Sequence, residues 1–128
     1  MSVRIVRLGT PRMPGEGTRI GTVRRPPRGV PKGEFSRRNW YDVWFPNLAP
    51  SAETMKFGQR AKTSAEWAAF VMRYRAEMAA PEAKHDLELL AALSRTASFS
   101  VGCYCEDESR CHRSTLRRLL VENGARVE

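Results

Sequence analysis

The stretch SFSVGCYC, residues 98–105, consists of small and apolar residues and contains neither a proline nor a charge. This composition is typical of a strand that is buried on both faces, as the strands of parallel sheets are. The polar run EDESRCHRST follows it, and a helical pattern begins near Arg113 and stops at Asn123-Gly124. The sequence therefore predicts a central strand, a turn and a helix over residues 98–124.

Two further strands are expected before this one, at residues 3–8 and 18–23, with loops rich in glycine and proline after each. A helix is expected to begin at the N-cap Ser51, a second at the Thr63 capping box, and a third at Pro81. Strands separated by helices favour an α/β fold, with a small mixed or parallel sheet packed by helices.

Apolar side chains at helical spacing mark the faces that these helices should bury. The predicted stripes are Trp67, Phe70, Val71, Tyr74 and Met78 in the second helix, Ala83, Leu87, Leu90 and Ala91 in the third, and Leu116, Leu119 and Leu120 in the last. The aromatic segment 39–51 has no clear period, and Trp40, Trp44 and Phe45 in it are expected to pack in the core.

The length of 128 residues suits a single α/β domain that buries a core without disulfides. Within residues 1–128 we distinguish a basic strand-loop segment (1–40), a helical segment (51–95) and a strand-turn-helix segment (98–124). No apolar run could span a membrane or serve as a signal peptide, so a cytoplasmic location and no membrane partner are expected. In that compartment the three cysteines are expected to be thiols or ligands rather than disulfides.

The net charge of +8 is concentrated at one end of the chain. Residues 1–40 contain ten Lys or Arg residues against two Glu, whereas the remaining residues contain equal numbers of basic and acidic side chains. Such a block either attracts a phosphate-bearing ligand or nucleic acid, or is a solvated loop. Nine of the ten basic residues are Arg, and this favours binding because a guanidinium can contact phosphate in a bidentate manner.

The turn after residue 105 is the candidate functional site, because ligands of α/β sheets bind at the carboxyl ends of strands. The N-terminus of the next helix would offer free N–H groups to an anion, and Arg110 and Arg113 would add positive charge. The same surroundings would lower the pKa of Cys105 or Cys111.

Three interpretations of this turn remain open. Cys103, Cys105, Cys111 and His112 could bind zinc, but Cys-x-Cys on a buried strand differs from the usual Cys-x₂-Cys knuckle, so no metal and no other cofactor are expected. Alternatively, Cys105 or Cys111 is a catalytic nucleophile with His112 as its base and Glu106 as a carboxylate partner. In the third interpretation the thiols, Cys103 above all, are inert core residues and the turn binds an anion without chemistry.

Several motifs together resemble a known family. The run CYCEDESRCHRSTLRRLL resembles the Cys-x-Glu…Cys-His-Arg signature of the domain of unknown function 488 family, and TVRRPPRGVPKG, WFPNLAPSAE and EWAAFVMRYRAEM resemble blocks of its short YeaO-like branch. The resemblance covers almost the whole chain and implies a compact α/β domain, without implying a reaction. The matching residues are Arg24, Arg28, Gly29, Leu48, Ala49, Pro50, Ser51, Phe70, Tyr74, Glu77, Cys105, Cys111, His112 and Arg113, with Glu106 after Cys105 as a candidate acid.

The chain departs from this family pattern at two positions. The family's acidic residue before the first arginine is Val23 here, and its tryptophan is Pro26. An enzymatic interpretation is weakened if that acid pairs with an arginine or acts as a base.

The sequence thus predicts one anion-binding site, in which Arg24 and Arg28 join Arg110 and Arg113 at the Cys105–Arg113 turn. The leading hypothesis is an enzyme or sensor that acts on a nucleotide or nucleic acid. The alternative is a nucleic-acid-binding accessory protein without catalysis, which uses the basic N-terminal third.

Overall fold

The computed structural model describes all residues 1–128 and contains one parallel sheet of four strands. The strands are β1 (Val3–Arg7), β2 (Thr18–Gly21), β3 (Val43–Trp44) and β4 (Phe99–Cys103). Their order is β1-β4-β2-β3, and every neighbouring pair is parallel. The predicted α/β class is confirmed, the sheet is parallel rather than mixed, and β4 is the central, fully buried strand that its composition indicated.

The protein has four α-helices, which begin where the sequence predicted, except for the last. They are α1 (Ala52–Arg60), α2 (Ser64–Met78), α3 (Pro81–Leu93) and α4 (His112–Glu122). The Ser51 hydroxyl accepts a hydrogen bond from the Thr54 N–H and so caps α1. Thr63 and Glu66 form the expected reciprocal capping box at the start of α2. None of the helices has the length and apolar character needed to cross a membrane.

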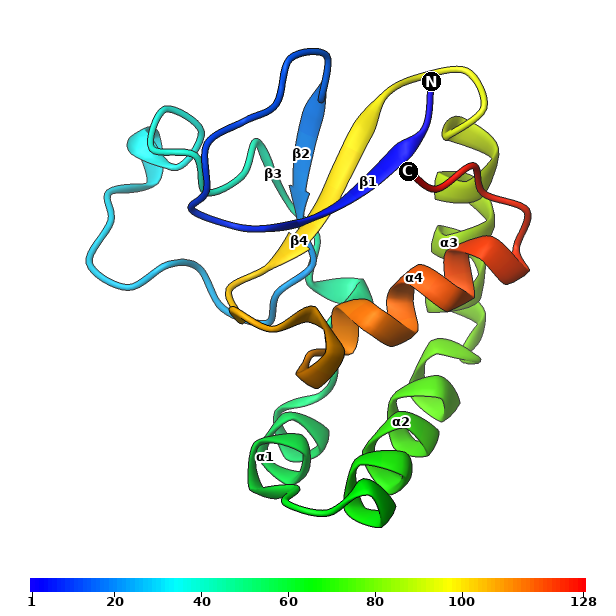
Figure 1. The fold of residues 1–128 in the computed structure, drawn as a ribbon. Helices are drawn as coiled ribbons and strands as arrows, with labels where there is room; N and C mark the ends of the chain where they lie inside the picture. The colour runs from blue at the N-terminus through cyan, green and yellow to red at the C-terminus, as the bar shows by residue number, and fades with distance from the viewer.

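The two faces of the sheet are covered differently. Figure 1 shows α3 and α4 along one side of the strands, with α1 and α2 beyond their carboxyl ends. Between strands and helices lies the larger core cluster, which contains most of the predicted stripe residues. All the stripe residues of α3 and α4 are buried, whereas in α2 the buried ones are Phe70, Tyr74 and Met78.

The opposite face carries no α-helix and is covered by two loops, residues 8–17 and 22–42, drawn in blue to cyan in Figure 1. Glycines in the central strands let these loops approach closely. A Cβ at Gly21 would lie 2.4 Å from the ring of Tyr41, and one at Gly102 would lie 2.8 Å from the side chain of Leu8. Any larger residue at either position would push the loop layer off the sheet.

A buried ion pair holds the two loops to this face. The Arg19 side chain on β2 is fully buried and donates two hydrogen bonds to the carboxylate of Glu16, at 2.7 and 3.1 Å. Its Nη1 donates to the backbone carbonyls of Thr10 and Asn39, at 2.9 and 2.8 Å. Ser100 on β4 donates to the same Glu16 carboxylate. One guanidinium therefore connects both loops to the sheet.

Three local predictions need correction. Trp44, expected in the core, is 44% exposed because it lies on the edge strand β3, where its Nε1–H donates to the carbonyl of Val23 at 2.8 Å. Strand β4 ends at Cys103, two residues before the predicted end. Helix α4 begins at His112, before the start that the sequence suggested, so His112 and Arg113 lie in its buried first turn.

Glu16 should make the protein sensitive to acid. Burial alone would raise its pKa, but the hydrogen bonds from Arg19 and Ser100 outweigh burial and lower the pKa from 4.5 to about 2. A carboxyl whose pKa is lower in the folded state stabilises the fold above its unfolded pKa, and this contribution is lost as the pH falls from 4.5 toward 2. Urea denaturation at several pH values between these limits should show this loss.

The variant Glu16→Gln tests the same pair at neutral pH. It leaves the Arg19 charge buried without a counter-charge, and we expect a loss of about 3 kcal/mol in the free energy of unfolding. The variant should also lose less stability than the wild type in acid. Glu88→Gln, which changes an exposed glutamate on α3 without an ion pair, is the matched control and should behave as wild type. Equal acid sensitivity in Glu16→Gln and the wild type would contradict the assignment.

Candidate functional site

The carboxyl ends of β1 and β4 form a switch point of the sheet. After β1 the chain turns to the loop-covered face, where the Thr10 carbonyl reaches Arg19. After β4 it enters α4, which packs against α2 and α3 on the helical face. Neighbouring parallel strands whose connections leave to opposite faces open a crevice between them, and this is where ligands of α/β sheets bind.

A basic pocket of about 580 Å³ opens at this crevice, on the loop-covered side. Its volume falls within the usual range for small-molecule sites. The walls come from the end of β1, from the residue after β4 and from the loop 22–42. The lining residues are Arg7, Leu8, Gly9, Thr10, Arg25, Pro26, Pro27, Arg28, Trp40 and Tyr104.

The charge of the basic pocket is only partly neutralised. Arg25 and Arg28 are exposed, and their guanidinium groups form neither a hydrogen bond nor an ion pair. Arg7 has a weak interaction with Glu106, at 3.7 Å, and both side chains are well exposed. Two prolines, Pro26 and Pro27, stiffen the backbone between the free arginines. The pocket therefore presents uncompensated positive charge on a restrained loop.

Aromatic rings form another wall of the basic pocket. Trp40 and Tyr104 pack edge to face with their ring centroids 5.8 Å apart. The Tyr104 hydroxyl donates to the carbonyl of Arg25 at 2.8 Å, so the loop and the strand end are tied together. Gly9 permits this arrangement because a Cβ there would lie 2.8 Å from the Trp40 ring.

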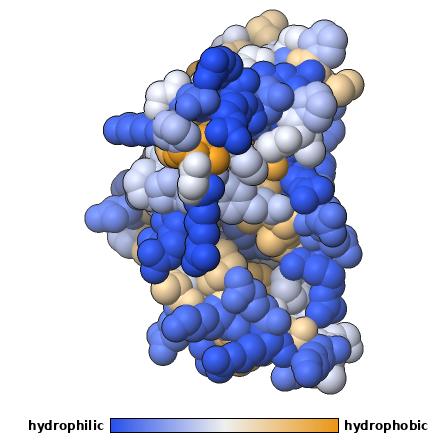
Figure 2. Space-filling view, turned by 90° about the vertical axis from the view of Figure 1, so that its left-hand side faces the viewer, coloured by the Kyte–Doolittle hydropathy of each residue, from blue (hydrophilic) through white to orange (hydrophobic).

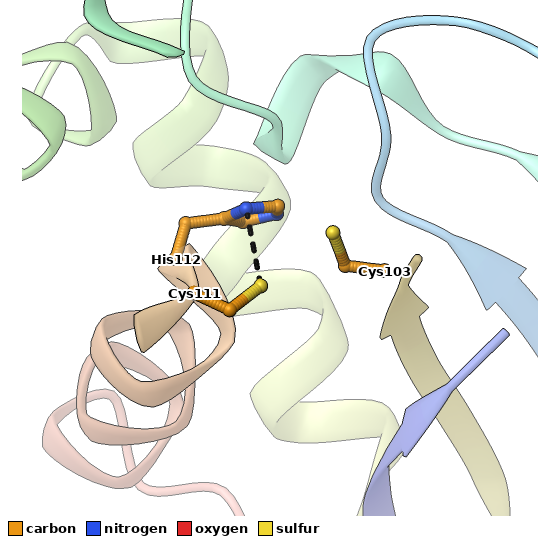
Figure 3. A group of neighbouring side chains, drawn as sticks. All are labelled: Cys103, Cys111 and His112. Atoms are coloured by element: carbon orange, nitrogen blue, oxygen red, sulfur yellow. Dashed lines mark hydrogen bonds between the residues drawn. The ribbon is translucent and has the colours of Figure 1, made fainter. Parts of the chain in front are cut away.

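The thiols gather on the other side of the same turn. Tyr104 points toward the loop-covered face, and its neighbours Cys103 and Cys105 point toward the helices, as alternation along an extended chain requires. Figure 3 shows Cys103 at the end of β4 facing Cys111 and His112 at the start of α4. One ligand atom from each of these three residues lies within 4.8 Å of the other two. The sulfur of Cys105 lies 3.8 Å from that of Cys103.

His112 is buried and is held in one orientation. Its Nε2 lies 2.9 Å from the backbone carbonyl of Thr22, and because a carbonyl can only accept, Nε2 carries the proton. In the neutral imidazole this leaves the lone pair on Nδ1, which faces the sulfur of Cys111 at 3.8 Å. The ring can accept a proton from that thiol or bind a metal ion at Nδ1.

The three thiols differ in acidity. The hydrogen bond between Cys103 and Cys105 raises the pKa of Cys103, and burial raises it further. The same bond, together with the contact to Cys111, lowers the pKa of Cys105, and the nearby charge of Arg113 acts in the same direction. The hydrogen bond from Cys103 also lowers the pKa of Cys111, with a smaller contribution from His112.

Arg113 does not lie where a surface anion ligand would. The residue is only 3% exposed, and its Nη2 donates to the backbone carbonyl of Cys105 at 2.6 Å. Its Nε is buried without a partner, and no carboxylate forms an ion pair with it. Because α4 begins at His112, Arg113 lies under the turn, and its guanidinium does not face a ligand at the surface.

The other predicted site residues separate into different surroundings. Arg24 donates to the carbonyls of Ala49 and Pro50, away from the basic pocket. Arg110 donates to the carbonyl of Ala61 and lies over the ring of Trp67. The Glu106 side chain is 84% exposed and points toward Arg7 rather than the thiols. The structure therefore unites Cys105, Cys111 and His112, with Arg113 and Arg110 beside them. It places Arg28 in the basic pocket and leaves Arg24 and Glu106 outside both sites.

Sequence reasoning missed four side chains of the basic pocket, namely Arg7, Arg25, Trp40 and Tyr104. The position of Tyr104 between Cys103 and Cys105 was a usable signal, because alternation requires it to point away from the thiols. The positions of Arg7 and Trp40 depend on the packing of the loops, for which the local sequence has no periodic signal.

Comparison with known proteins identifies one family. A family model described as the active DUF488-N3 subclade matches residues 3–124. No curated protein and no solved structure matches the chain.

The thiols should react at different rates. Cys105 is half-buried and lines a small cavity of about 70 Å³, whereas Cys103 and Cys111 are 3% and 2% exposed. In the presence of a chelator, iodoacetamide should label Cys105 first, as peptide mass spectrometry of timed samples would show. Cys105→Ser should remove only the fast phase. Labelling of all three thiols at one rate would contradict the described burial.

Proposed function

The chain belongs to the DUF488 family, and we propose that it binds a phosphate-bearing ligand of the nucleotide class in the basic pocket. The observation that carries the proposal is the convergence of Arg7, Arg25 and Arg28 beside the aromatic pair Trp40 and Tyr104. Binding of such a ligand is the step that an enzyme and a sensor would share.

The arginines favour phosphate over other anions. Phosphate oxygens accept hydrogen bonds from the planar fork of a guanidinium in a bidentate manner. Arg25 and Arg28 have no internal partner that would have to be displaced first. Because Pro26 and Pro27 restrict the loop between them, less conformational entropy is lost when both side chains engage one ligand.

The aromatic wall favours a ligand with a planar ring. Trp40 and Tyr104 are partly exposed within the basic pocket, and their faces or edges can contact a heterocyclic base. The volume of about 580 Å³ is ample for a base, a sugar and phosphate groups together. Inorganic phosphate alone would leave this wall uncovered, so we expect it to bind more weakly than a nucleotide.

The proposal assigns no reaction to the thiols. Cys105, Cys111 and His112 lie behind the backbone of Tyr104, on the helical side of the turn. The candidate acid Glu106 faces solvent. We expect a ligand in the basic pocket to contact the arginines and the aromatic pair and to have no direct contact with the sulfur atoms.

Nucleic-acid binding is the second candidate function. Figure 2 shows a mainly hydrophilic surface on the loop-covered side, and further exposed cations, Lys32 and Arg38, lie on this loop beyond the basic pocket. A single strand could place one nucleotide in the basic pocket and its neighbouring phosphates along these cations. The distinguishing property is a steep dependence of affinity on salt.

Calorimetric titration of the protein with ADP tests the first candidate. Arg25→Ala and Arg28→Ala should each weaken ADP binding about tenfold, because each removes one charge-assisted contact. Arg38→Ala removes the same charge from the same loop outside the pocket and is the matched control. It should retain wild-type affinity. Equal weakening by all three variants would show a diffuse effect of charge and would contradict a defined pocket.

Titration with a short oligonucleotide at several salt concentrations tests the second candidate. If nucleic acid is the ligand, the affinity should fall steeply with salt, and Arg38→Ala should reduce the salt slope as Arg25→Ala does. If a mononucleotide is the ligand, the oligonucleotide should bind no better than ADP. Absence of binding to ADP, pyrophosphate and oligonucleotide at low salt would overturn both.

A further inference from the structure

We propose that Cys103, Cys105, Cys111 and His112 form a tetrahedral zinc site between the end of β4 and the start of α4. This site is independent of the ligand in the basic pocket, because none of its four residues lines that pocket. Cysteine thiolates and a neutral imidazole are the donor set that structural zinc sites use. The fold brings these donors together from two segments, although their spacing along the chain differs from that of a zinc knuckle.

The distances between donor atoms suit this geometry. Two sulfur ligands at about 2.3 Å from a tetrahedral zinc ion are separated by about 3.8 Å. The sulfur atoms of Cys103 and Cys105 lie 3.8 Å apart. Cys111 Sγ and His112 Nδ1 are also 3.8 Å apart. The three buried donors lie within 4.8 Å of one another, so small side-chain adjustments would bring them to ligand distance.

His112 is oriented as a metal ligand should be. Its Nε2–H donates to the carbonyl of Thr22, and this leaves the Nδ1 lone pair directed toward the sulfur of Cys111. A hydrogen bond from the distal ring nitrogen to a backbone carbonyl is the usual support for a zinc-bound histidine. The sulfur atoms of Cys103 and Cys111 both lie within 4.8 Å of the His112 ligand atom.

The surrounding charge also favours a metal ion. Three thiolates, one neutral imidazole and Zn²⁺ carry a net charge of −1, and the thiol protons leave to solvent when the ion binds. Arg113 supplies a compensating positive charge, since its guanidinium is buried beside Cys105 and has no carboxylate partner. The Nε–H of Arg113 has no partner and could donate a hydrogen bond to a metal-bound thiolate.

The site is closed rather than catalytic. Cys103, Cys111 and His112 are all buried. Cys105 would be the fourth ligand, and it lies in the wall of the small cavity between α1, α2 and the turn. With four protein ligands no position remains for water or substrate. Zinc would fix the strand end and the helix start across the turn 104–110, and so it would stabilise the fold.

Metal analysis of the full chain purified without chelator tests the proposal directly. We expect one zinc ion per chain by mass spectrometry of the elements. Cobalt substituted for zinc should give thiolate-to-cobalt charge-transfer absorption and the intense visible bands of a tetrahedral ion. Removal of zinc should lower the melting temperature, and added zinc should restore it.

Three variants make the ligand assignment specific. Cys105 is only half-buried, so the variant Cys105→Ser should fold. It should weaken zinc binding at least tenfold and shift the cobalt spectrum. His112→Gln should lose the same cobalt bands, whereas His85→Gln, at the only other histidine, should keep them. If His112→Gln does not fold, the Cys105→Ser spectrum alone decides the matter, because an unchanged spectrum would exclude Cys105 as a ligand.

Other outcomes would overturn the proposal. One is a zinc content well below one per chain after exposure to excess zinc, with a melting temperature that chelator does not change. A second is a Cys103–Cys105 disulfide in protein purified without reductant, detected by thiol counting after denaturation. Iron-sulfur or copper absorption in the purified protein would likewise overturn the assignment to zinc.

Discussion

The buried guanidinium of Arg19 is the contact on which the loop-covered face depends. Most α/β sheets have helices on both faces, and here one face has only two irregular loops. Arg19 compensates by donating hydrogen bonds from all three guanidinium nitrogens, to Glu16, Thr10 and Asn39. Since Thr10 lines the basic pocket and Trp40 directly follows Asn39, the pair that holds the loops also shapes the candidate ligand site.

The alternation of side chains at the end of β4 separates two kinds of chemistry at one turn. Side chains alternate along the residues that leave β4, so Tyr104 faces the basic pocket and Cys105 faces the helices. The sequence suggested one site in which arginines and thiols act together. The structure instead places uncompensated arginines on one side and the thiol-imidazole cluster on the other, with a single backbone segment between them.

Much of the helical half could be predicted because its signals are local. The Thr63 capping box, the Pro81 start and the leucine stripe of α4 each involve residues within a few turns of one another. The loop-covered face could not be predicted in the same way. The burial of Arg19 and Arg113 and the exposure of Trp44 are set by contacts between distant segments, and the two-residue strand β3 is too short to have a period.

Prediction of the candidate site from the sequence was likewise limited, because residues that meet in the structure are far apart along the chain. The sequence analysis singled out the turn around which Cys103, Cys105, Cys111 and His112 gather, because these residues lie within ten positions of one another. It judged the zinc interpretation by linear spacing, which cannot show that Cys103 and His112 face each other across the turn. Arg7 and Trp40 have no sequence neighbour that would connect them to Tyr104.

The register of the central strand also affects how the chain can fold. Strand β4 pairs Val3 with Phe99 on one side and Thr18 with the same residue on the other, and β1 and β2 do not pair with each other. Strand β1 therefore leaves the ribosome without a strand partner and acquires one only when β4 has been made, whereas β2 can pair earlier with the two-residue strand β3. Sheets closed by such remote pairings fold slowly, because closing a long loop costs conformational entropy before the stabilising contacts between the strands are made. An N-terminal fragment that stops before residue 99 would contain three strands and the first three helices but no strand able to join β1 to β2.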